Sequence, residues 1–408
     1  MPLEIIFYTA SFVGIYFSIF LLITLFENRK NLSRKPSQKE FPELTVLIPC
    51  YNEEKSLAPT VRSVLNADYP ADKLNVMIID DGSSDNTYGI GLQLAKRHQN
   101  VEIYHKENGG KYTALNCGLK KIKTELVATL DADCFIDEKS LSRITAYFED
   151  KETDAVTSSV KVYKPQTIWQ YFQNTLYLFV LLLRKTFSFF GSVKVTPGPL
   201  SVFRREVFEK VGYYRHGHQT EDIEMGLRLQ ENNCQVKHAL DSYVYTKTPT
   251  TFKALYHQRV RWAYGGIKNL WDYRHLFGPQ HGNLGMLVLP ANLASFIAFP
   301  LSISIVLYRL ISHGLRYLHS WSAVGFSGDA LLSFLPSFSF SVPSPLIMIG
   351  AVQITLTLIF ILFSKKLTRD NSKIGRSLLF AALFSFPLLS LYLISAFYRI
   401  ISNQTVKW

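Results

Sequence analysis

Residues 126–133 read LVATLDAD, a run of apolar and β-branched residues that leads directly into Asp131 and Asp133. A run of this length and composition is typical of a strand buried on both faces. Three similar runs stand upstream, at residues 44–48, 76–79 and 101–104. Helical patterns separate them, and strands that alternate with helices predict an α/β domain with a mostly parallel sheet.

Polar residues directly follow three of these predicted strands. Tyr51 and Glu53 come after the first strand, Asp81 ends the second, and Asp131 and Asp133 end the fourth. Because the carboxyl ends of parallel strands share one edge of a sheet, we expect these side chains in one ligand site. For any single motif the alternative is a plain turn, since Asp is common after strands. The presence of several such motifs at one edge favours a ligand site over plain turns.

The two aspartates of the DAD motif predict a metal site. Two carboxylates separated by one residue offer oxygen ligands to Mg²⁺ or Mn²⁺, and the metal keeps positions for phosphate and water. We expect Asp133 to be the direct ligand. A metal held there would act as a Lewis acid on a departing diphosphate.

The other residues of this edge suit a nucleotide. Asp81 and Glu53 can accept hydrogen bonds from a ribose or a base, and the Tyr51 ring can stack on the base. Lys111 follows two glycines at a predicted helix start and is placed for the phosphates. The Gly-Gly-Lys motif lacks the full phosphate-loop pattern, so by itself it is a weak signal.

A second acidic motif, Thr220-Glu221-Asp222, begins a predicted helix. As a functional residue, Asp222 would be a general base that takes a proton from an acceptor hydroxyl. The alternative is structural: Thr220 caps the helix, and acidic residues in its first turn gain about 0.3–1 kcal/mol from the helix dipole.

The motif QRVRW at residues 258–262 lies on a predicted amphipathic helix, residues 251–264. Helical spacing places Gln258, Arg261 and Trp262 on one side, while an apolar stripe suits a membrane interface. Arg261 can neutralise a diphosphate, and the Trp262 ring can stack on a sugar. The alternative is an ordinary basic and aromatic interface anchor.

The chain also predicts several membrane spans. Four segments have the length and apolar composition for a crossing, at residues 5–26, 284–310, 346–363 and 377–397. Basic residues follow the first segment and fill the loop between the last two. The positive-inside rule then predicts a multi-pass protein of the cell membrane with its N-terminus outside and its catalytic domain in the cytosol. The apolar run 171–183 is too short to span, and we expect it at the interface beside the catalytic domain.

The net charge of +12 does not indicate nucleic-acid binding. Basic residues cluster next to the predicted spans, where they face anionic lipid, and no nucleic-acid motif accompanies them. Membrane lipids are therefore expected partners, and nucleic acid is not.

Taken together, the motifs resemble those of the membrane-embedded family 2 glycosyltransferases, which include cellulose, hyaluronan and poly-N-acetylglucosamine synthases. The resemblance covers about residues 42–271, and in length and topology it is strongest to the bacterial poly-N-acetylglucosamine synthases. It implies a nucleotide-diphospho-sugar transferase (GT-A-like) domain and inversion at the anomeric carbon. The implied domains are an anchor at 5–26, a transferase domain at 42–250, an interfacial helix at 251–277 and about three membrane helices at 284–400.

The resemblance also implies roles for single residues. It places nucleotide-sugar contacts at Tyr51, Glu53, Asp81, Lys111 and Asp131. It places the metal at Asp133, the base at Asp222, and acceptor or diphosphate contacts at Glu221, Gln258, Arg261 and Trp262. Residues 197–205 are similar to the acceptor-side stretch of the family.

The function implied is transfer of a hexose from a nucleotide-diphospho-sugar, with a UDP-sugar expected, to a polysaccharide or lipid hydroxyl. The QRVRW motif favours processive synthesis of a β-linked polymer, for which an accessory membrane subunit is a further partner to consider. A single transfer to a lipid stays open, because ceramide glucosyltransferases look similar. A third alternative is a non-enzymatic membrane scaffold or transporter. The intact carboxylates argue against it, because a protein without activity does not need them.

Overall fold

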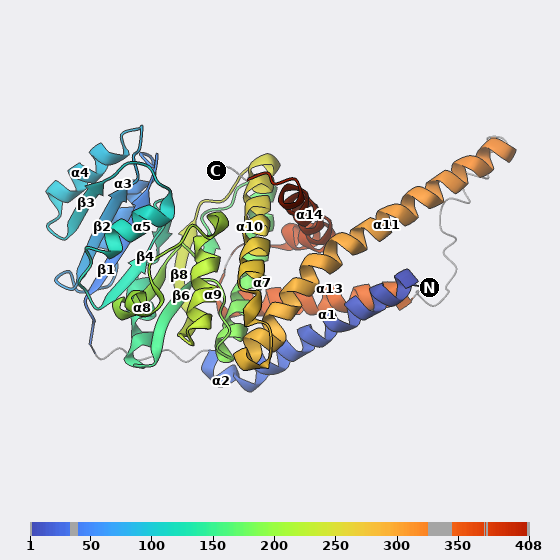
Figure 1. The fold of residues 1–408 in the computed structure, drawn as a ribbon, viewed down its shortest axis with the longest axis horizontal. Helices are drawn as coiled ribbons and strands as arrows, with labels where there is room; N and C mark the ends of the chain where they lie inside the picture. The colour runs from blue at the N-terminus through green and yellow to red at the C-terminus, as the bar shows by residue number, and fades with distance from the viewer. Residues whose placement is uncertain (1, 33–39, 325–344, 371, 373, 406–408) are drawn as a thin grey trace.

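The computed structural model describes residues 2–32, 40–324, 345–370, 372 and 374–405 of the chain. An α/β domain lies at one end of the molecule, and long helices extend away from it (Figure 1).

The domain is built on one eight-stranded sheet of order β3-β2-β1-β4-β7-β6-β8-β5. The strands are β1 (Leu44–Cys50), β2 (Leu74–Asp80), β3 (Val101–His105), β4 (Leu126–Thr129), β5 (Cys134–Ile136), β6 (Thr153–Val162), β7 (Ser201–Arg204) and β8 (Gln235–Thr246). The pairs β1–β2, β1–β4, β2–β3 and β6–β8 are parallel, and the pairs that involve β7 or β5 are antiparallel. The predicted α/β fold and its four early strands are confirmed.

Helices cover both faces of the sheet because its central strands are apolar on both sides. In β1, Val46 and Ile48 enter a core under α3 (Leu57–Leu65), α4 (Thr87–Arg97) and α6 (Ser140–Thr145). The residue between them, Leu47, enters a second core on the opposite face. The helices of that face are α5 (Lys111–Leu119), α8 (Arg205–Val211) and α9 (Glu221–Glu231). Alternation of side chains along a strand produces this division.

Long apolar helices form the rest of the described chain. They are α1 (Pro2–Glu27), α11 (Leu289–Val324), α13 (Pro345–Leu367) and α14 (Gly375–Ile401), with the short α2 (Arg29–Leu32) after α1. Within the described residues, Leu284–Ile305, Met348–Leu367 and Ser377–Ile401 are long and apolar enough to cross a membrane. These three correspond to the predicted late spans and indicate a membrane protein. In α1 the corresponding apolar segment is Ser11–Glu27, which is shorter. The anchor role of α1 and the sidedness of the chain stay predictions.

Two further helices join the domain to the membrane helices. The run 171–183 belongs to a longer helix, α7 (Ile168–Phe189), which begins with a capping box at Thr167 and Gln170. It contacts β6 and β8 as well as α13 and α14, so it lies between the sheet and the membrane helices (Figure 1). The QRVRW motif lies on α10 (Phe252–Asp272), which extends beyond the predicted helix of residues 251–264. This helix packs along α14.

Candidate active site

Asp81 is an organising residue at the sheet edge. Its carboxylate, which is only 3% exposed, accepts hydrogen bonds from the amides of Gly109 (3.2 Å) and Gly110 (2.8 Å) and from Lys106 Nζ (2.5 Å). These contacts fix the turn before α5. Gly110 has φ of +89°, a backbone conformation that side chains disfavour. The turn therefore sets the position of Lys111, the first residue of α5.

Lys111 joins the early and late acidic motifs. Its Nζ lies 2.5 Å from Asp131 Oδ1 and 3.3 Å from Glu221 Oε1. Burial alone would lower the pKa of Lys111, but the charges of Asp131 and Glu221 outweigh burial and raise it. A Cβ atom on Gly198 would lie 2.5 Å from Lys111 Nζ and 2.7 Å from both Asp131 carboxylate oxygens. Only a glycine allows this segment to approach the ion pair so closely.

The DAD motif offers a ligand set for a divalent metal. Single ligand atoms of Asp131, Asp133 and Cys134 all lie within 4.8 Å of one another. Burial raises the pKa of the Cys134 thiol well above its ordinary value, so the sulfur stays protonated and the two carboxylates are the ligands to consider. Burial, followed by the charge of Asp131, raises the pKa of Asp133 to about 6. A cation bound there would stabilise the ionised form of Asp133. Carboxylate oxygens are ligands that suit Mg²⁺ and Mn²⁺.

Tyr51 and Glu53 lie on the same edge of the sheet. The amide of Asp81 donates to the carbonyl of Cys50, which places Tyr51 beside the end of β2. The Tyr51 side chain is 50% exposed. The amide of Glu53 donates to Thr87 Oγ1 at 2.7 Å, and its carboxylate accepts a hydrogen bond from Ser56. Tyr51 is thus free to receive a flat ring.

Asp222 stands at the start of α9, held mainly through its backbone. Its carbonyl oxygen accepts from the amide (3.1 Å) and the hydroxyl (3.2 Å) of Thr196, and its Oδ1 accepts from the amide of Ile223 (3.0 Å). Burial, followed by the charge of Glu221, raises the pKa of Asp222 to about 6, although Lys111 opposes the shift. A carboxylate of this kind is ionised at neutral pH and more basic than an ordinary aspartate, which suits a general base.

Thr220 stands at the N-cap position of α9, but its side chain does not cap the helix. Its hydroxyl donates to the carbonyl of Gly217 at 2.8 Å and accepts from Asn269 Nδ2 at 2.9 Å, and its side chain makes no capping hydrogen bond. The structural alternative for Thr220 is therefore wrong. A Cβ atom on Gly265 would lie 2.2 Å from Thr220 Oγ1, so α10 packs directly against the turn before α9. This close approach brings the QRVRW motif to Asp222.

The members of the QRVRW motif face different surroundings. Arg261 Nη1 donates to the carbonyl of Gln219 at 3.0 Å. Burial lowers the pKa of Arg261, and the charges of Glu221, Asp222 and Asp131 oppose that shift, which places the guanidinium among the carboxylates. Trp262 instead lines a cavity beside α11 and α14. Gln258 Oε1 is buried and has no hydrogen-bond partner in the described part of the chain.

Two charged groups near the site were not predicted. Arg184 on α7 has a buried Nη1 with no hydrogen-bond partner among the described residues. Burial lowers the pKa of Arg184 to about 10, and the charge of Asp222 is the main opposing influence. Arg259, inside the QRVRW motif, also has buried nitrogens without partners. The one sequence signal for Arg184 is a charge directly after the apolar run 171–183.

Comparison with known proteins agrees with this geometry. The family model described as glycosyl transferase family 2 matches residues 45–212. This part of the chain is therefore similar to glycosyl transferase family 2. The match begins in β1 and ends directly after α8, so it contains Tyr51, Glu53, Asp81, Lys111 and the DAD motif.

Curated proteins similar to this chain are named poly-β-1,6-N-acetyl-D-glucosamine synthases. One from Staphylococcus epidermidis is 29% identical over 271 residues, which are 64% of this chain and 65% of the relative. One from Staphylococcus aureus (strain COL) is 30% identical over 262 residues, 62% of this chain and 63% of the relative. The chain thus matches somewhat less than two thirds of the length of these relatives.

A solved structure resembles this chain over nearly its whole length. The mannosyltransferase PcManGT from Pyrobaculum calidifontis, solved with GDP-Man and Mn²⁺, matches with a TM-score of 0.60 and 18% identity. The match covers 97% of this chain and 99% of that one. At this identity the similarity concerns the fold, and it includes the long helices as well as the GT-A-like domain.

Proposed function

We propose that the protein is an inverting glycosyltransferase that moves a hexose from a nucleotide-diphospho-sugar to an acceptor hydroxyl. The observation that carries this proposal is the single cluster formed by Asp222, Glu221, Lys111, Asp131 and Arg261. In this proposal Asp222 is the general base, Asp131 is one of the two metal ligands, and Lys111 and Arg261 are the cations for a diphosphate; the contacts and charges that link these residues support it. That combination suits a displacement with an anionic leaving group.

The chemistry follows from the charges. The acceptor oxygen forms a bond to the anomeric carbon while its proton moves to the Asp222 carboxylate, and the bond from that carbon to the donor phosphate breaks. The nucleoside diphosphate leaves with the electron pair. Lys111 and Arg261 lie close to the negative charge that develops, and such preorganised charges stabilise a transition state more than water does. Asp133, with Asp131, would hold a divalent cation, which would supply Lewis-acid stabilisation of the same leaving group.

In the same proposal, three residues of the sheet edge contact the nucleoside of the donor. Tyr51 stacks on the base, and Glu53 and Asp81 lie on the nucleoside side of the edge. The Asp81 carboxylate also orders the turn that carries Lys111, so its contribution is partly indirect. Gln258 and Trp262 form the acceptor side, next to the membrane helices.

We propose further that the product is a β-linked polysaccharide made by repeated transfer from a UDP-sugar. The names of the relatives support an N-acetylglucosamine polymer as the first product to test. The packing of α10 along α14 supports an acceptor platform fixed against the membrane. The catalytic domain is proposed to face the cytosol, with Mg²⁺ or Mn²⁺ as the metal and an accessory membrane subunit as a further partner.

Membranes that contain the full chain provide the test. They are incubated with radiolabelled UDP-N-acetylglucosamine and Mg²⁺, and the product is sized by chromatography and mass spectrometry. We expect a polymer whose length grows with time. A product that stops at one sugar on a lipid would overturn polymer synthesis, and no incorporation from any UDP-hexose would overturn the donor class.

A further inference from the structure

A second site lies on the membrane side of α10. It is a cavity of about 230 Å³ between α9, α10, α11 and α14. Its lining is mostly apolar and contains two basic residues, Lys194 and Arg259, and no acidic residue. The volume is below the ~300–1,000 Å³ usual for small-molecule pockets, and the lining lacks the polar groups that a sugar chain needs. The cavity fits a small anionic group better than an oligosaccharide.

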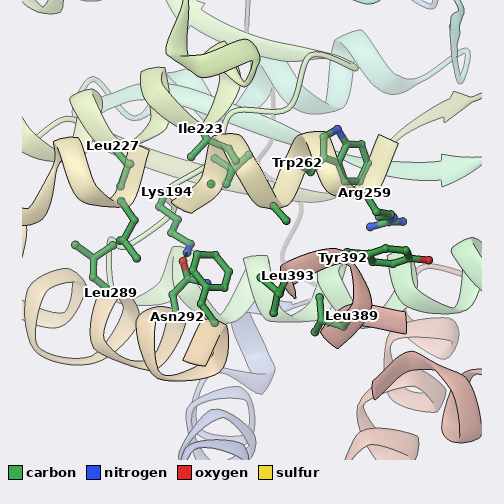
Figure 2. A pocket seen from close by; sticks show the side chains of 15 residues that line it. Lys194, Ile223, Leu227, Arg259, Trp262, Leu289, Asn292, Leu389, Tyr392 and Leu393 are labelled. Carbon is green, nitrogen blue, oxygen red and sulfur yellow. Dashed lines mark hydrogen bonds between the residues drawn. The ribbon is translucent and has the colours of Figure 1, made fainter. Parts of the chain in front are cut away.

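Arg259 is the decisive residue of this cavity. Its Nε and Nη2 atoms are buried and have no hydrogen-bond partner in the described part of the chain. Its guanidinium lies 4.5 Å from the centre of the Trp262 ring and 5.9 Å from that of Tyr177. Figure 2 shows it between Trp262 and Tyr392, whose hydroxyl is also buried without a partner. Ring faces stabilise a cation only modestly, so a buried guanidinium without an acceptor is costly unless an anion binds there.

Lys194 supports the same conclusion from another wall of the cavity. Its amine donates to the side-chain oxygen of Asn292 on α11, and burial lowers its pKa to about 7 (Figure 2). A neutral amide is its partner where a carboxylate would be expected. Among the described residues that line it, the cavity thus holds two desolvated basic groups and no acidic side chain.

The walls of the cavity indicate where the anion comes from. Leu289, Asn292 and Phe296 belong to one candidate membrane span, and Leu389 and Leu393 to another. An amphiphile in the bilayer can therefore place its apolar part against these helices and its head beside Arg259. We propose that this cavity binds the phosphate head of an anionic membrane lipid, with Arg259 as the main contact and Tyr392 as a second donor.

The site shares its walls with the catalytic residues. Ile223, which lines the cavity, follows Asp222 on α9, and Trp262 follows Arg261 on α10. Lys194 lies two residues before Thr196, which holds the backbone of Asp222. A bound lipid therefore contacts the three segments that position the proposed base. The lipid site itself does not rest on the proposed transferase activity.

The test compares the parent chain with Arg259→Gln in nanodiscs of phosphatidylcholine, alone or mixed with phosphatidylglycerol. The readout is the unfolding temperature. Lys253→Gln is the matched control, because Lys253 is an exposed cation at the start of the same helix. We expect phosphatidylglycerol to raise the unfolding temperature of the parent and of Lys253→Gln by roughly 3–5 °C. We expect no rise for Arg259→Gln, which in phosphatidylcholine alone is at least as stable as the parent.

The same measurement is made on a second variant and with inorganic phosphate in place of the lipid. Tyr392→Phe removes a hydroxyl that has no hydrogen-bond partner among the described residues, so we expect it to leave the fold intact and to reduce the lipid-dependent rise. Inorganic phosphate added to protein in neutral detergent is expected to give no rise. An equal rise in the parent, Arg259→Gln and Tyr392→Phe would overturn the site. A rise with inorganic phosphate alone would overturn a lipid as the source of the anion.

Discussion

The sheet edge and the membrane side of the site balance their charges in different ways. At the sheet edge two carboxylates have a cation beside them, Lys106 for Asp81 and Lys111 for Asp131. On the membrane side, Arg184 and Arg259 have buried nitrogens with no acceptor in the described residues. The ion pairs of the sheet edge are therefore formed before any ligand binds, whereas on the membrane side the proposed lipid phosphate would accept hydrogen bonds from Arg259. The predictions below test this contrast.

The largest effect is expected at the junction of the two regions. Asp222→Asn keeps an oxygen for the amide of Ile223, so the start of α9 is retained, but the side chain can no longer take a proton. We expect the turnover rate to fall by about 10²–10⁴, the usual contribution of a general base. Titration calorimetry with UDP should show unchanged nucleotide affinity. Parent-like turnover would remove Asp222 from the role of base.

The second largest effect is expected when the divalent metal is removed. Chelation by EDTA should reduce transfer at least about a hundredfold, since Lewis-acid stabilisation is worth several kcal/mol. Added Mg²⁺ or Mn²⁺ should restore it in the parent but not in Asp133→Asn. Asp150→Asn, an exposed carboxylate paired with Lys237, is the control and should behave as the parent. Indifference to EDTA would show that the sheet edge works with Lys111 and Arg261 alone.

A methyl group tests how rigid the sheet edge is. In Gly198→Ala the new Cβ atom would meet Lys111 and both Asp131 oxygens, so the segment or the ion pair must shift. We expect about a tenfold to hundredfold loss of kcat/KM, seen mainly as weaker donor binding, because small misplacements of reacting groups are costly. Gly350→Ala, which has open space around it, should leave the kinetics unchanged. A parent-like Gly198→Ala enzyme would mean that this edge adapts easily.

The pH profile gives the smallest effect. The pKa of Asp222 is raised to about 6, and a base acts in its deprotonated form. Activity should therefore be full above that value and fall as the pH drops through it, to about a tenth at pH 5. The measurement is kcat/KM against pH for the parent, with residual activity of Asp222→Asn as the reference. An acid limb at pH 4 or below would indicate an ordinary, solvated aspartate.

The sheet edge could be predicted well because it depends on local signals. Each β-strand there is a short apolar run, and its functional residues follow it directly in the chain. The predicted strands agree with β1 to β4 within a few residues, and the DAD aspartates lie where the end of β4 places them.

The membrane side could not be predicted to the same degree. Arg184 lies far from Asp222 in the sequence, and only the packing of α7 between the sheet and the membrane helices brings them together. Thr220 shows the same limit. Its sequence context suits a helix cap, yet its hydroxyl joins the turn at Gly217 to α10 because Gly265 lets that helix approach.

By itself, the sequence determined the order of the early strands and of the carboxylates along the chain, and the late apolar spans. Local patterns suffice for these, because strand burial, turn residues and span length are properties of neighbouring residues. The tertiary structure decided what each side of α10 faces. Arg259 and Arg261 are two residues apart, a rotation of about 200° around a helix, so they must point in nearly opposite directions. Only the packing of α10 between α9 and α14 turns Arg261 toward the carboxylates and Arg259 toward the membrane-side cavity.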